Sequence, residues 1–162
     1  MALSELLAAT LERAHDPKRA TDESLDSSET VAAPILNSDF LAELEGRLNA
    51  PYPEFLRVLY TEIGDGGYGP GYGLITAEEA VERALAWREP GVPDLLPFVY
   101  WGCTVYSVTE LASGRVGILD LDATNDDFPA LEATWWQYDT LSAFWTAWLN
   151  GEELFFPVGD DE

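Results

Sequence analysis

The chain has 162 residues, of which 30 are Asp or Glu and 8 are Lys or Arg, so its formal net charge is −22. Hydrophobic residues make up 47% of it, an ordinary fraction for one globular domain with a sizeable core. Because clustered Lys and Arg are needed to bind phosphate backbones or anionic membranes, nucleic acid and membranes are excluded as expected partners. A basic protein is the natural electrostatic complement, and acidity that serves solubility or a salty cytoplasm is the simpler alternative.

The chain has one cysteine, Cys103, and one histidine, His15, which exclude an intrachain disulfide and a zinc cluster of several soft ligands. Few cysteines suit a cytoplasmic protein, no apolar run is long enough to span a bilayer, and Glu5 stands where a secretion signal is basic. Cys103 is expected to be a small core hydrophobe in an apolar strand beside Trp101, and His15 to lie in a linker. We therefore expect no enzyme activity, and we assign no catalytic residue, metal or cofactor.

The first 36 residues are predicted to be an appendage to the main domain. Leucines at helical spacing predict a short amphipathic helix over residues 3–14. Residues 15–33 are polar and lack a large apolar face, which is typical of a linker or mobile loop. The main domain is assigned to residues 37–156, and an acidic tail to residues 157–162.

Three helices are predicted next, each opened by a capping side chain or a proline. Asn37 or Ser38 caps the first, which extends to Leu48. The second follows Pro53, and Gly64 is expected to end it in the left-handed conformation. The third is residues 77–87, which follow the capping-box pattern Thr76-Ala-Glu-Glu79.

The periodicity then changes to that of strands. Strands are expected over residues 95–101, 104–109 and 116–121, with the last two forming a hairpin, and a short strand or edge at Trp135 and Trp136. These tryptophans are expected to point to opposite faces, one of them outside the core. Asp139 or Thr140 caps a last aromatic helix. Helices first, then strands and one helix favour an α+β fold, a mainly antiparallel sheet flanked by helices.

One ordered series of segments resembles a known family. It consists of Pro51-Tyr-Pro53 before the helix Phe55-Leu-Arg-Val-Leu-Tyr60, then Ile63-Gly-Asp-Gly-Gly67, Tyr68-Gly-Pro-Gly-Tyr-Gly-Leu74, a hairpin around Trp101-Gly102, and the helix Leu141-Ser-Ala-Phe-Trp-Thr-Ala-Trp148. Over about residues 37–155 the chain resembles the SUKH superfamily, named for relatives of the yeast regulator of cell-wall synthesis and killer-toxin resistance. The family commonly has Asn-Gly-Gly where this chain has Asp65-Gly66-Gly67.

The resemblance implies an α+β fold and brings no catalytic constellation. Many bacterial members look like immunity proteins that bind and neutralise a toxin domain, often a nuclease, whereas eukaryotic members are scaffolds or regulators. We therefore expect a cytoplasmic, monomeric immunity protein that blocks a basic toxin domain by stoichiometric occlusion. The alternative is an intracellular regulator or scaffold of the same type without a toxin partner.

Two segments are weighed as sites. The glycine-rich segment 64–73 follows a helix and lacks the Lys-Ser/Thr of a P-loop, so a tight connection with positive φ is favoured over a phosphate site. The acidic run from Asp120 to Asp127 does not have EF-hand spacing, so a specific metal site is not expected there. The simpler interpretation is a solvated loop after a strand, and the immunity hypothesis uses the same carboxylates as phosphate mimics that face a basic groove. The predicted partner-binding residues, carboxylates and tyrosine anchors, are Asp65, Tyr68, Tyr72, Glu110, Asp122, Asp126, Asp127 and Glu132.

Overall fold

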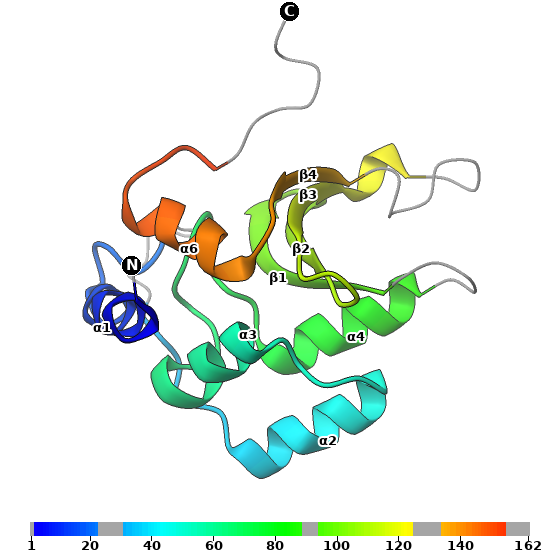
Figure 1. Cartoon of the computed structure of the whole chain (residues 1–162), viewed down its shortest axis with the longest axis horizontal. Helices are drawn as coiled ribbons and strands as arrows, with labels where there is room; N and C mark the ends of the chain where they lie inside the picture. The colour runs from blue at the N-terminus through cyan, green and yellow to red at the C-terminus, as the bar shows by residue number, and fades with distance from the viewer. Residues whose placement is uncertain (1, 23–30, 89–93, 125–133, 155–162) are drawn as a thin grey trace, which may run out of the picture.

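The computed structural model describes residues 2–22, 31–88, 94–124 and 134–154 (Figure 1). Within them, helices flank one four-stranded antiparallel sheet, which confirms the predicted α+β fold. Helix α4 (Ala77–Trp87) covers one face of the sheet, and α6 (Leu141–Leu149) covers the other. Helix α2 (Ser38–Leu48) lies beyond α4, away from the sheet.

The three capped helices begin where the sequence predicts them. The side chains of Asn37, Thr76 and Thr140 each accept a hydrogen bond from a backbone N–H in the first turn of α2, α4 and α6. The second predicted helix is α3 (Glu54–Val58), which continues as the π-helical segment η1 (Leu59–Ile63). Gly64 then has extended backbone, with φ at 169°, so the expected left-handed end at Gly64 is wrong.

The sheet has the strand order β1-β2-β3-β4, which follows the chain. Its strands are β1 (Leu95–Gly102), β2 (Val105–Glu110), β3 (Val116–Asp120) and β4 (Trp135–Tyr138), and the predicted β2–β3 hairpin is confirmed. A 3₁₀ turn, η2 (Leu121–Ala123), follows β3. On β4, Trp135 is opposite Ile118 and Trp136 is opposite Gly117, so the two tryptophans point to opposite faces, and 38% of Trp135 is exposed.

Helix α1 (Leu3–Ala14) is part of the core, so its prediction as an appendage is wrong. The buried indole of Trp145 on α6 donates to the buried hydroxyl of Thr10 at 2.9 Å. Ala20 is also fully buried, and its carbonyl accepts the Gly69 N–H at 2.7 Å. A buried indole N–H needs an acceptor, and a residue of α1 supplies it, which ties the start of the chain to its last described helix.

Cys103 is exposed, so its prediction as a core residue is wrong. Strand β1 ends at Gly102, whose φ is +101°, and Cys103 follows in the β1–β2 turn with φ at +52°. Two consecutive left-handed residues reverse the chain and place the thiol outside the sheet. His15 is also exposed, at the C-terminal end of α1.

Candidate functional site

Tyr68 is fully buried, so its prediction as an interface anchor is wrong. Its hydroxyl donates to the Leu59 carbonyl at 3.0 Å and lies 3.1 Å from the Gly64 carbonyl. Its ring packs edge-on against Trp145. Burial raises the pKa of the phenol well above its ordinary value, so Tyr68 is neutral at physiological pH and acts as part of the core.

Asp65 is also a structural residue. Its Oδ1 accepts the N–H of Ala77, the first residue of α4, at 2.9 Å. Burial raises the pKa of Asp65, and the hydrogen bond from Ala77 opposes that rise. The following Gly66 and Gly67 have φ of +98° and +87°, which confirms the predicted tight connection with positive φ. The carboxylate therefore joins the glycine-rich segment to α4.

Glu110 is 6% exposed at the end of β2, which corrects its prediction as part of an acidic contact surface. It accepts hydrogen bonds from Ser113 Oγ at 2.6 Å and Arg115 Nε at 2.8 Å. Burial alone would raise the pKa of Glu110, but the hydrogen bonds and the charge of Arg115 outweigh it and hold that pKa below its ordinary value. Its oxygens are committed to the β2–β3 turn.

The other predicted contact residues are dispersed. Tyr72 is half-buried and packs on Tyr100, with ring centroids 5.6 Å apart. Asp122 is exposed in η2, at the end of the β2–β3 ladder opposite to Glu110. Asp126, Asp127 and Glu132 lie outside the described residues. The described members of the predicted set therefore do not form one surface.

Every arginine of the chain forms an ion pair with one of the chain's own carboxylates. These pairs leave the excess of Asp and Glu uncompensated, so the protein presents a field that is almost purely anionic. The pairs are Arg13–Asp22, Arg19–Glu12, Arg47–Glu78, Arg47–Glu82, Arg57–Glu45, Arg57–Glu54, Arg83–Glu79, Arg88–Asp94 and Arg115–Glu110.

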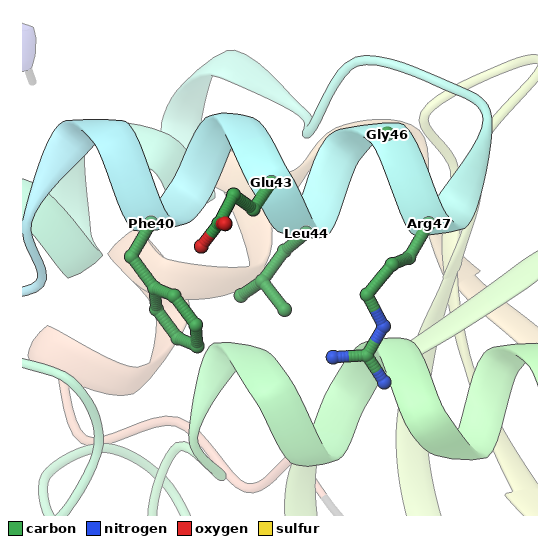
Figure 2. A pocket seen from close by; sticks show the side chains of 5 residues that line it. All are labelled: Phe40, Glu43, Leu44, Gly46 and Arg47. Atoms are coloured by element: carbon green, nitrogen blue, oxygen red, sulfur yellow. The ribbon is translucent and has the colours of Figure 1, made fainter.

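A groove of about 490 Å³ lies along α2, and we call it the α2–α4 groove because Arg47, one of its lining residues, reaches α4 (Figure 2). Figure 2 shows the side chains of Phe40, Leu44 and Arg47 reaching from α2 toward α4. The residues that line it are Phe40, Glu43, Leu44, Gly46 and Arg47. Arg47 spans the two helices, with its guanidinium nitrogens 3.4 Å from Glu78 and 3.7 Å from Glu82. The lining thus includes one carboxylate and one arginine, and the arginine connects the groove to two further carboxylates on α4.

This groove is not among the sites predicted from the sequence. Two features of the sequence of α2 relate to it. Phe40, Glu43, Leu44 and Arg47 have the i, i+3, i+4, i+7 spacing of one helix face. Gly46 interrupts an otherwise helical pattern, and in the structure a Cβ built there would meet no atom within 4 Å. The surface beside Gly46 is therefore open.

The sequence matches no protein-family model, and no curated protein matches it. In the part of the chain that the structure describes, no three His, Cys, Asp or Glu side chains group to hold a metal ion. No helix among these residues has the length and apolar character needed to cross a membrane.

Proposed function

We propose that this protein is a non-catalytic binding protein of the SUKH type, an immunity protein that neutralises a basic toxin domain in the cytoplasm. The observation that carries the proposal is that every arginine is held by the chain's own carboxylates. A protein of net charge −22 whose arginines are neutralised internally attracts a cationic partner and repels polyanions. The same charge opposes self-association, so we propose a monomer.

The mechanism we propose is occlusion. A nuclease needs a basic groove because its substrate is a polyanion, and carboxylates can occupy the positions of the phosphates. Steering by the anionic field speeds encounter, and half-buried aromatic residues such as Tyr72 supply anchors once contact is made. Because screening shortens the reach of the field, the association rate is expected to fall as salt is raised.

The resemblance supports the choice of class. The glycine-rich segment, its sharpest part, is where the structure has consecutive left-handed glycines, and the family position usually held by Asn is occupied by Asp65, whose side chain accepts the Ala77 N–H. An Asn side chain also has an oxygen that could accept this bond. The replacement of the usual Asn by Asp65 is therefore compatible with the hydrogen bond to the Ala77 N–H.

The first experiment is affinity capture of the tagged chain from a lysate of its native host, at low and then moderate salt, with mass spectrometry of the bound proteins. We expect one dominant partner, bound stoichiometrically and carrying a basic toxin-like domain. Recovery of housekeeping or cell-envelope proteins, or of no reproducible partner, would contradict the proposal and favour a regulator or scaffold.

A further inference from the structure

The α2–α4 groove has two kinds of wall, apolar and anionic. Phe40 is half-buried and packs against the core, and Leu44 is fully buried beside it, so the apolar surface that the groove offers is that of Phe40. Glu43 on α2 and Glu78 and Glu82 on α4 are exposed beside that surface. An apolar surface with an acidic rim is complementary to an apolar side chain flanked by cations.

The ion pairs of Arg47 with Glu78 and Glu82 are exposed to solvent. Its side chain is 43% exposed, and the carboxylates that it meets are 50% and 59% exposed. Exposed ion pairs of this kind contribute little to folding, because water and salt screen them. A cation from another protein can therefore replace Arg47 at Glu78 and Glu82 with little effect on stability.

We propose that the α2–α4 groove is the docking site for a short cationic segment of the partner. The segment places an aliphatic or aromatic side chain against the exposed part of Phe40, and its Arg or Lys side chains displace Arg47 from Glu78 and Glu82. The inference rests on the proposed function and adds to it the surface that is used and the chemistry of the segment bound. A second copy of this chain is disfavoured as the occupant because it brings the same negative charge.

The probe for the test is a synthetic amphipathic helical peptide with a leucine face flanked by arginines, and a scrambled peptide of the same composition is its control. Binding is measured by calorimetry, and backbone amide shifts of the ¹⁵N-labelled full chain show where the peptide lies. We expect the shifts to concentrate in α2 and α4, and the scrambled peptide to bind at least about fivefold more weakly, because it cannot present both chemistries on one face.

Charge variants distinguish binding at this groove from the general attraction between an anionic protein and a cationic peptide. The double variant Glu78→Gln, Glu82→Gln is expected to weaken peptide binding about tenfold. Its matched control, Glu62→Gln with Glu153→Gln, removes the same charge from exposed positions elsewhere and is expected to change affinity less than about twofold.

Removing the positive charge of Arg47 is expected to have the opposite effect on peptide affinity. Arg47→Gln removes the internal competitor and tightens peptide binding about threefold. Arg19→Gln, which removes an exposed arginine paired with Glu12 on α1, is the control and leaves the affinity nearly unchanged.

A steric variant tests the groove without altering charge. Gly46→Trp adds bulk at a residue that lines the groove. A Cβ at this position meets nothing within 4 Å, so we expect the variant to fold and to bind the peptide at least about tenfold more weakly. Circular dichroism and thermal unfolding verify that the variant is folded. Unchanged peptide binding by folded Gly46→Trp would overturn the proposed site.

Several further outcomes would also overturn the inference. These are amide shifts scattered over α1 or the sheet, equal binding of the scrambled peptide, equal effects of the two double variants, no binding, or concentration-dependent self-association through α2. Failure of the proposed function is distinguishable, because it is measured with the captured partner and not with the peptide. A partner that is neutralised equally well by Gly46→Trp would leave the immunity function standing and reject the groove.

Discussion

The glycine-rich segment and the α2–α4 groove both contain carboxylates beside aromatic or apolar residues, but they use them in opposite ways. Asp65 and Tyr68 have their polar atoms bonded to backbone groups, and Tyr68 is completely buried. Glu43, Glu78 and Glu82 are exposed, and Arg47 pairs with Glu78 at 3.4 Å and with Glu82 at 3.7 Å. Burial therefore separates the side chains that hold the fold from those that are free to contact another protein. Substitutions in the two regions should accordingly differ in whether they change stability or binding.

The largest effect is expected at Tyr68. Tyr68→Ala empties a buried site and removes the donor to the Leu59 carbonyl, so it should lower the free energy of unfolding by about 4 kcal/mol. Tyr68→Phe keeps the ring and should cost only about 1 kcal/mol. Urea denaturation measures both. If Tyr68→Ala left stability intact and abolished partner binding, the residue would be a contact residue and the comparison would fail.

The next effect is expected at Glu110, whose partners are Ser113 and Arg115. Glu110→Gln should lower the free energy of unfolding by about 2 kcal/mol at neutral pH, because a buried charge-assisted pair is lost. The pKa of Glu110 is lowered by folding, so its contribution is present above the ordinary carboxylate pKa and is lost as pH falls through the folded value. Unfolding curves from neutral pH to below about 4 should show the difference between wild type and Glu110→Gln shrinking. A difference independent of pH would contradict this assignment.

Replacing glycine by alanine should change the free energy of unfolding in opposite directions at Gly66 and Gly46. Gly66→Ala forces a side chain onto a φ of +98° with its Cβ 2.9 Å from the Leu74 carbonyl oxygen, and should cost about 2 kcal/mol of stability. Gly46→Ala lies in open space within α2 and should stabilise by about 1 kcal/mol. Thermal unfolding of the two variants measures both signs. Equal destabilisation would show that the α2–α4 groove is as tightly constrained as the glycine-rich segment.

The smallest effect is expected at Asp65. Folding raises the pKa of Asp65, so the folded state binds the proton more tightly than the unfolded state does. The stability that this protonation contributes is therefore lost as pH rises through the pKa of the folded state. Asp65→Asn keeps an oxygen for the Ala77 N–H without the charge and should stabilise by about 0.5 kcal/mol at neutral pH. This gain in stability should vanish in acid, as urea denaturation at neutral and at acidic pH would show. A clear loss of stability at neutral pH would mean that the carboxylate charge itself is needed.

The elements that were predictable are those with local causes. Asn37, Thr76 and Thr140 mark helix starts because a cap bonds within its own first turn, and the Ser113-Gly114 turn marks the β2–β3 hairpin. The turn also offered a missed signal, because Ser113 and Arg115 lie close enough in sequence to engage Glu110.

The errors came from contacts distant in the sequence. Tyr68 was assigned to the surface because it lies in a glycine-rich loop, but Trp145, far along the chain, covers it. Helix α1 was set apart because residues 15–33 are polar, yet its Thr10 accepts the Trp145 indole. Local pattern also could not pair Arg47 with Glu78, because which helices adjoin depends on the whole packing.

The measurement that tests the central claim most directly is a titration of the captured partner's toxic activity with the purified full-length chain. The account predicts that activity falls linearly and ends at one chain per toxin domain, and that the association rate drops as salt rises. Undiminished activity at saturation, or inhibition that continues far beyond an equimolar ratio, would contradict neutralisation by stoichiometric occlusion.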